Sequence, residues 1–317
     1  MASTVGTHTT ISLEPYANPR AAEAEEAFDT ATLSLGPLQV VVHSEAPLLT
    51  HQLQTIYSSA DAPHATEDGG TPEPARHVYQ VRKESTFRDG LATYSVARDG
   101  ETWLRNCTEG VLLDSLEWSI TDAARRMLPG YHLFHAGAVA RNGHGILLPG
   151  PSGAGKSTTV AALALNGFEY CSDELALVGP DARLRPFPRI IALKLTGWQR
   201  IAQCFPDGVS DASWPSVPTN SNRYVRPPLC PDADRSARGF PVDFVLLPQH
   251  GPGNTPGLSP IPKSRALKEL VEQSLDLQLW GTSGLDLVME LVRGADCYYL
   301  NCNDLTEAVA LVESLTR

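Results

Sequence analysis

The stretch GPSGAGKS at residues 150–157 matches the pattern G-x-x-x-x-G-K-[S/T] at every fixed position. Glycines in this pattern let the loop curl so that backbone N–H groups point at phosphate oxygens. Lys156 can reach the β- and γ-phosphates, and the hydroxyl of Ser157 can ligate Mg²⁺. The apolar run 146–148 precedes the loop and the helical pattern 156–165 follows it, which puts the positive end of a helix dipole at the same spot. The pattern therefore predicts a nucleoside-triphosphate site in a strand–loop–helix unit.

The residues expected to contact the nucleotide are the loop and the first turn of the helix. They are Gly150, Pro151, Ser152, Gly153, Ala154, Gly155, Lys156, Ser157 and Thr158. The alternative is a chance glycine-rich turn. The strand and the helix in register on either side of the loop argue against that alternative.

The second half of the chain alternates strand-like and helix-like segments, which is typical of an α/β fold. Asn142-Gly143 between two apolar runs predicts a hairpin, because both residues tolerate positive φ. Asp304 followed three residues later by Glu307 predicts the start of the last helix. Strands are expected at 133–140, 144–148, 168–171, 175–178, 190–193, 242–247 and 297–300, and further helices at 265–275 and 285–292.

The first part of the chain is predicted to form a smaller N-terminal α+β domain. Strands are expected at 38–43, 78–82 and 92–96, and a helix at 114–127. The helix should end before Pro129-Gly130, so we place the domain boundary there, between residues 1–128 and 129–317. Residues 60–76 read as a loop, and 205–239 contain too many Pro, Ser, Asp and Arg residues for a regular element.

Composition restricts the partners and the compartment. With a net charge of −11 the chain is a poor binder of polyanions, so neither nucleic acid nor an anionic membrane is expected as a partner. No apolar stretch approaches the roughly 18 residues that a membrane span needs. Residues 1–15 lack the basic and apolar regions of a signal peptide. The six cysteines form no C-x-x-C pair and are expected to be reduced thiols, so we expect a cytoplasmic protein.

Two adjacent acids, Asp173 and Glu174, follow the expected strand 168–171. In many P-loop NTPases the second magnesium-binding acid ends a distant apolar strand, but here the strand 242–247 continues into Pro-Gln-His. If the strands around the loop helix are parallel, the acid pair lies on the sheet edge that carries the loop. One carboxylate can then turn to the metal and the other to an incoming hydroxyl, because adjacent side chains of an extended chain point opposite ways. A solvated turn is the alternative.

His135 lies in the strand before the hairpin, where a lone histidine is more often structural than functional. His132 and His135 form an H-x-x-H pattern, but in a strand they point to opposite faces. We therefore do not expect them to bind a metal together.

The combination of HAG before the hairpin, GPSGAGKS, and SDE after the next strand resembles the HPr kinase/phosphorylase superfamily. It is most similar to the HPr-kinase-related proteins that accompany peptide-modifying gene clusters, including lasso-peptide kinases. The tail segments PIPKSRALKELVEQSL and YYLNCNDLTEAVALVESL also resemble that subfamily. The resemblance runs from about Leu112 to the C-terminus.

The resemblance implies a phosphoenolpyruvate-carboxykinase-like P-loop core and ATP-dependent phosphorylation of a serine or threonine hydroxyl. It also implies that Asp173 is the catalytic base and lies near the metal, and that Glu174, where HPr kinases have aspartate, holds Mg²⁺ with Ser157. His135 occupies the position of the active-site histidine of the family.

The chain departs from the family in the segment that resembles LEIRGLG. Ala192 replaces a glutamate of the metal site and Lys194 replaces an arginine, which puts the metal shell and the phosphorylase half-reaction in doubt. HPr itself is therefore not the expected acceptor. Residues 225–228 read VRPP and resemble a segment that closes the site in the related kinases, which makes Arg226 a candidate and Arg223 a weaker one. Solvated loop charges are the alternative for both.

These patterns predict a kinase that transfers the γ-phosphoryl group of ATP to a Ser/Thr hydroxyl of a peptide or small protein, such as a peptide natural-product precursor. Lys194 or Arg226 would neutralise charge on the transferring group. A kinase of free serine or another small alcohol and a nucleotide-dependent regulatory module are the alternatives. A homo-oligomer is compatible with the family, and the sequence leaves this open.

Overall fold

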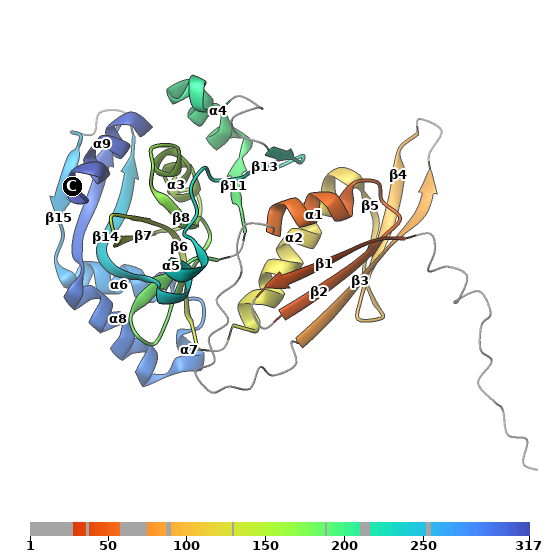
Figure 1. Cartoon of the computed structure of the whole chain (residues 1–317), viewed down its shortest axis with the longest axis horizontal. Coiled ribbons are helices and arrows are strands. Elements are labelled where there is room, and N and C mark those ends of the chain that lie inside the picture. The colour runs from red at the N-terminus through yellow and green to blue at the C-terminus, as the bar shows by residue number, and fades with distance from the viewer. Residues whose placement is uncertain are drawn as a thin grey trace, which may run out of the picture.

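The structure of the chain is a computed structural model. It describes residues 28–35, 38–57, 75–86, 90–128, 130–187, 189–209, 216–251 and 255–317. Within these residues the fold is mixed α/β with several sheets. A five-stranded sheet with two helices lies beside a larger, helix-covered sheet (Figure 1).

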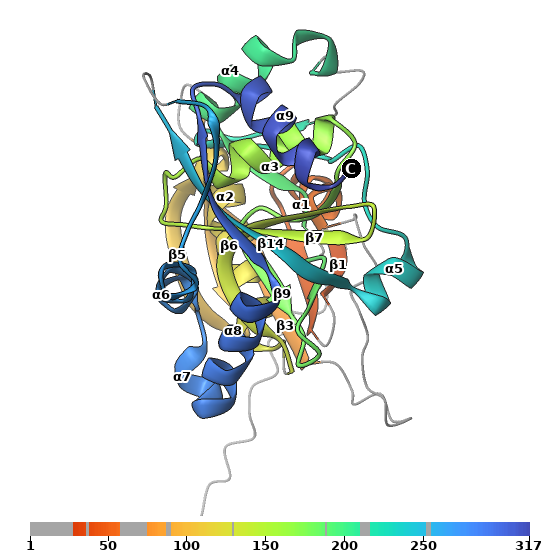
Figure 2. The same cartoon turned by 90° about the vertical axis from the view of Figure 1, so that its left-hand side faces the viewer.

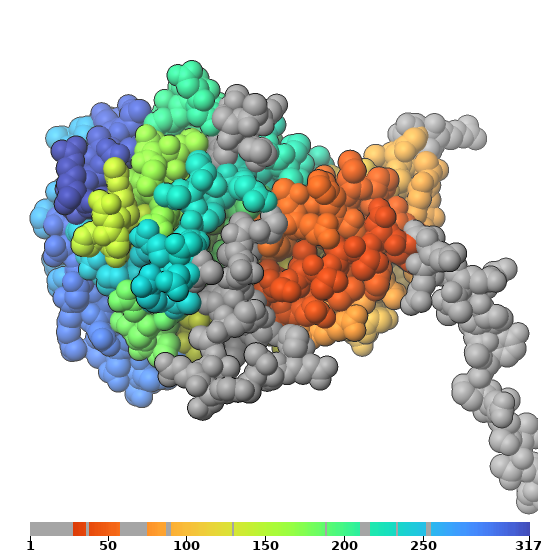
Figure 3. All heavy atoms as spheres, in the orientation of Figure 1, coloured from red at the N-terminus to blue at the C-terminus, as the bar shows by residue number. Residues whose placement is uncertain are grey.

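The five-stranded sheet has the order β1-β2-β3-β4-β5, and only β2 and β3 are parallel. Its strands are β1 (Asp29–Leu35), β2 (Leu38–Ser44), β3 (Ala75–Thr86), β4 (Ala92–Arg98) and β5 (Glu101–Thr108). The helices α1 (Leu49–Tyr57) and α2 (Glu109–Arg126) pack against this sheet. Atoms of β1, β2 and α1, in orange and red, form one continuous surface in Figure 3. The three strands and the helix expected here are confirmed, whereas β1, β5 and α1 were not foreseen. Most of the expected loop 60–76 lies outside the described residues.

The larger sheet has the order β10-β9-β6-β7-β14-β16-β15, and β8 also pairs with β6. Its strands are β6 (His132–Arg141), β7 (His144–Pro149), β8 (Glu169–Ser172), β9 (Leu175–Val178), β10 (Arg183–Arg185), β14 (Phe240–His250), β15 (Gly257–Pro260) and β16 (Asp296–Cys302). Both β7 and β8 are antiparallel to β6, so they run in the same direction. Ala138 of β6 has Leu147 and Ser172 as its two partners. The end of β8 therefore lies at the sheet edge that carries the glycine loop, as expected.

Helices cover both faces of this sheet, since alternate residues of the buried strands point to opposite sides. Ile146 and Leu148 belong to a core with α3 (Lys156–Leu165) and α9 (Leu305–Leu315). Leu147 belongs to a second core with α6 (Lys263–Gln273) and α8 (Thr282–Gly294). Figure 2 shows these two helix pairs on opposite sides of β7 and β14.

The segment 205–239 contains regular structure, so the expectation of none is wrong. It includes a short 3₁₀ helix (Pro206–Gly208), β12 (Ser216–Pro218), β13 (Asn222–Val225) and α5 (Ala233–Arg238). β12 and β13 join β11 (Ile191–Lys194), which precedes the segment, in a small antiparallel sheet. The strand order of this sheet is β11-β13-β12. Pairing with a distant strand supplies hydrogen bonds that local composition does not predict.

One buried apolar cluster contains residues from both sides of the expected boundary at 128/129. Leu116 of α2 shares it with Leu133 of β6, Leu177 of β9 and Ile190. The boundary therefore stays a prediction. None of the described helices is long and apolar enough to cross a membrane.

Candidate functional site

The glycine loop joins β7 to α3 in a conformation that its glycines permit. Gly153 has φ of +88° and Gly155 has φ of +87°, values that residues with a Cβ rarely adopt. The ammonium of Lys156 donates hydrogen bonds to the carbonyl oxygens of Gly150 at 2.7 Å and of Pro151 at 3.2 Å. Burial lowers the pKa of Lys156, and the carboxylates of Glu174 and Asp173 oppose this change.

His250 at the end of β14 contacts the loop through the side chain of Thr159. Its Nε2 lies 3.0 Å from Oγ1 of Thr159, which donates to the carbonyl of Gly155 at 2.9 Å. Its Nδ1 lies 2.9 Å from Sγ of Cys302. Burial lowers the pKa of His250 and raises the pKa of Cys302 to about 11, so both groups are neutral at pH 7. A single tautomer of His250 then satisfies every hydrogen bond in the series from Cys302 through His250 and Thr159 to Gly155. The sequence indicated only that no acidic residue follows the strand 242–247.

Replacing Gly155 by alanine should disturb the loop, and with it the nucleotide binding that the sequence predicts, far more than replacing Gly153. Both positions have positive φ, which costs a residue with a Cβ about 1–2 kcal/mol. A Cβ at Gly155 would lie 2.7 Å from Cδ2 of His250, whereas one at Gly153 meets nothing within 4 Å. We expect the Gly155→Ala variant to lose at least about tenfold more affinity for a fluorescent ATP analogue. Equal losses would show that contact with His250 does not matter.

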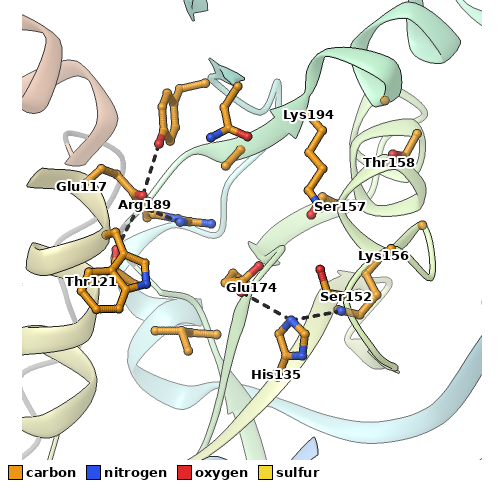
Figure 4. Close-up of a pocket in the computed structure, with 18 of the residues that line it drawn as sticks. Glu117, Thr121, His135, Ser152, Lys156, Ser157, Thr158, Glu174, Arg189 and Lys194 are labelled. Carbon is orange, nitrogen blue, oxygen red and sulfur yellow. Dashed lines mark hydrogen bonds and ion pairs between the residues drawn. The ribbon is translucent and has the colours of Figure 1, made fainter. Parts of the chain in front are cut away.

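A cavity of about 750 Å³ opens beside the loop, and residues from several elements line it. Its lining includes Glu117, Trp118, Thr121, Asp122, Arg125, His135, Ser152, Gly153, Gly155, Lys156, Ser157, Thr158, Glu174, Arg189 and Lys194. Figure 4 shows that residues of α2 form one wall and that the loop and α3 form the opposite wall. The loop residues Gly150, Pro151 and Ala154 are not part of the lining.

Three side chains meet in this cavity: His135, Lys156 and Glu174 (Figure 4). Nε2 of His135 lies 3.2 Å from the ammonium of Lys156 and 3.4 Å from a carboxylate oxygen of Glu174. Burial raises the pKa of Glu174, but the hydrogen bond with His135 and the charges of Arg189 and Lys156 outweigh it, so this pKa is lowered. Glu174 is therefore ionised at neutral pH.

Gln273 of α6 determines which nitrogen of His135 faces the cavity. Its amide nitrogen donates to Glu269 at 3.3 Å, so its oxygen, 3.1 Å from Nδ1 of His135, is left as an acceptor. Nδ1 therefore carries a proton and donates a hydrogen bond to Gln273, and Nε2 faces the cavity between Lys156 and Glu174. No motif pointed to Gln273.

Asp173 does not face the cavity, which corrects the expected position of its carboxylate at the reacting groups. The side chain is 1% exposed. One oxygen accepts from the hydroxyl of Tyr170 and from Arg189, each at 2.9 Å, and the other accepts from the backbone N–H of Ala192 at 3.1 Å. Adjacent acids do point opposite ways, but the first of them points into the protein interior.

Arg189 joins this buried acid to α2. It is 4% exposed and donates to Glu117 at 2.7 Å and to Asp173 at 2.9 Å. Burial lowers the pKa of Arg189, but the two carboxylates raise it well above its usual value. Neither Arg189 nor Glu117 belongs to a pattern that sequence reasoning identified.

The structure brings some of the expected cations to the cavity and not others. Lys194 is exposed and lines the cavity. Arg226 is exposed at the end of β13 and is not among the lining residues. The guanidinium of Arg223 lies 4.4 Å from the ring centroid of Trp198 and does not line the cavity either. The expectation that these arginines face the site is therefore not met.

The hydroxyl of Ser157 and the carboxylate of Glu174 are the side-chain oxygens that fit Mg²⁺ here. Both line the cavity, and Oγ of Ser157 lies 3.4 Å from the backbone oxygen of Asp173, the residue before Glu174. Mg²⁺ usually takes one or two protein oxygens and completes its shell with phosphates and water. The side-chain oxygens of Asp173 are already engaged, so this residue does not fit as a ligand. The described residues contain no cluster of three or more His, Cys, Asp or Glu side chains suited to a metal.

The cavity brings together side chains from distant parts of the sequence. The loop, the histidine and the acid come from three segments that are separate in the sequence. No protein-family model matches the sequence, and no curated protein matches it.

Proposed function

We propose that the chain is an ATP-dependent kinase with a P-loop core of the HPr kinase/phosphoenolpyruvate-carboxykinase-like type. Its acceptor would be a serine or threonine hydroxyl of a peptide or small protein. The observation that supports this proposal best is the position of His135 beside the glycine loop, with its Nε2 3.2 Å from the ammonium of Lys156 and 3.4 Å from a carboxylate oxygen of Glu174.

In the proposed reaction the loop amides and Lys156 hold the triphosphate. The ammonium of Lys156 moves from the carbonyl oxygens of the loop to the β- and γ-phosphates, which releases Nε2 of His135. Ser157 and Glu174 would hold Mg²⁺, which would neutralise charge on the phosphates.

His135 then accepts the proton of the acceptor hydroxyl at Nε2. The hydroxyl oxygen attacks the γ-phosphorus, the bond to the β–γ bridging oxygen breaks, and ADP leaves. Gln273 holds the ring in the required tautomer, and the nearby Glu174 stabilises the imidazolium that forms. Lys194 lines the same cavity and adds positive charge near the transferring group.

Mass spectrometry of synthetic serine and threonine peptides after incubation with Mg·ATP tests this function. We expect the gain of one phosphoryl group with the native chain and at least a hundredfold slower gain with Lys156→Met, which lacks the phosphate-binding charge. Lys268→Met is the matched control, because Lys268 lies exposed on α6 beside Glu272. Phosphorylation of small alcohols alone would identify a small-molecule kinase. Nucleotide retention without any transfer would identify a regulatory module and contradict the proposal.

A further inference from the structure

Three exposed apolar side chains lie beside two hollows that neighbour the cavity at the glycine loop. Leu48 is 67% exposed, Val111 of α2 is 47% exposed and Trp118 of α2 is 64% exposed. Val111 and Trp118 are seven residues apart, two helical turns, and therefore lie on the same face of α2. Exposed apolar side chains that share one face can form a binding surface.

Two hollows of about 310 Å³ each lie beside these residues. Trp118 lines both the large cavity and the first hollow, which Val111 and Trp103 of β5 also line. Gly110 lines both the first and the second hollow, and Leu48 lines the second. The two hollows are thus neighbours along α2, and the first of them adjoins the large cavity at Trp118.

The charged side chains of the large cavity differ from those of the two hollows. The lining of the large cavity carries both signs of charge, the cations Lys156, Lys194, Arg125 and Arg189 and the acids Glu117, Asp122 and Glu174. Among the described residues that line the two hollows, the only charged side chains are Asp114 and Glu109, which are both acidic. The hollows therefore favour neutral or basic ligands, whereas Lys156 at the glycine loop and the nearby Lys194 favour phosphate in the large cavity.

We propose that the hollows along α2 bind the acceptor of the kinase as an extended peptide. The peptide carries apolar residues for Trp118 and Val111, lacks acidic residues beside them, and places its hydroxyl in the large cavity. Val111 and Trp118 are about 10 Å apart along the helix, which corresponds to about three residues of a peptide in the polyproline II conformation, whose three-residue turn puts residues i and i+3 on the same face. This inference rests on the proposed kinase function and adds the surface that selects the acceptor.

Fluorescence anisotropy of two labelled peptides tests the surface without any need for turnover. Each peptide has one serine, leucines at the third and sixth positions to one side of it, and lysines at both ends. The leucines precede the serine in one peptide and follow it in the other. With Mg²⁺ and a non-hydrolysable ATP analogue present, we expect one peptide to bind and Trp118→Ala to weaken binding at least tenfold.

Two control experiments show whether the loss of peptide affinity comes from the contact between Trp118 and the leucines of the peptide. Leucine-to-alanine changes in the peptide should weaken binding to the native chain and should cost little more in Trp118→Ala. Leu279→Ala should bind as the native chain does, because Leu279 lies on α7 (Leu277–Trp280) and is 88% exposed there.

The outcomes separate this surface from the kinase function. Binding that depends on Trp118 without phosphoryl transfer would support the surface and contradict the kinase. Transfer to peptides with the same KM in Trp118→Ala would support the kinase and overturn the surface. Failure of both peptides to bind the native chain, or a Trp118-dependent dimer of the chain, would also overturn it.

Discussion

Replacing His135 by glutamine is expected to slow phosphoryl transfer about 10²–10⁴-fold, the usual contribution of a general base. Nε2 of His135 points into the cavity and lies 3.2 Å from Lys156 and 3.4 Å from Glu174. Glutamine is polar and similar in length but cannot accept the proton of the attacking hydroxyl. Nucleotide affinity should change little, since the loop and Lys156 remain. Single-turnover transfer and the affinity for an ATP analogue measure the two effects separately.

The matched control for this variant is His144→Gln. His144 lies at the opposite end of β7 from the loop, where it is half exposed and pairs with Asp243. This change should leave transfer at the native rate. If His135→Gln transferred as fast as the native chain, the proton would have to leave by another route, and the role given to His135 would be wrong.

The largest effect on stability is expected from Arg189→Met. Methionine removes the only charge that links Glu117 to Asp173 in the described structure, and both of these carboxylates are almost fully buried. Removing one partner of a buried ion pair leaves the other charge unpaired and typically costs about 3–5 kcal/mol. Urea unfolding should therefore show a free energy of unfolding lower by about that amount.

An exposed ion pair gives the comparison for this loss. Arg238 pairs with Asp234 at 3.3 Å, and both side chains are mostly exposed. Arg238→Met should change the free energy of unfolding by less than about 1 kcal/mol. Similar stabilities of the two variants would mean that the buried ion pairs of Arg189 do not stabilise the contact between α2 and the segment that carries Asp173.

Features set by a few consecutive residues could be predicted from the sequence. The hairpin at Asn142-Gly143 has φ of +53° and +87° at these two residues. The cap at Asp304 accepts a hydrogen bond from the N–H of Glu307 at 2.9 Å. The strand–loop–helix arrangement around Lys156 is also as expected. In each case the backbone preference of the local residues decides the structure.

Features that depend on distant partners could not be predicted. The choice between Asp173 and Glu174 depends on Arg189, whose own second partner, Glu117, lies 72 positions earlier on α2. Burying a charge costs so much that the acid beside a buried cation turns toward it, whatever the local pattern suggests. Gln273 and His250 likewise act on residues more than 90 positions away and belong to no short motif.

A structure of the chain with Mg²⁺ and a non-hydrolysable ATP analogue tests the central claim most directly. We expect Lys156 on the β- and γ-phosphates, with Glu174 and His135 beside the γ-phosphate and Asp173 still bound to Arg189. A carboxylate of Asp173 that has left Arg189 and turned to the γ-phosphate, with His135 pointing away, would contradict it.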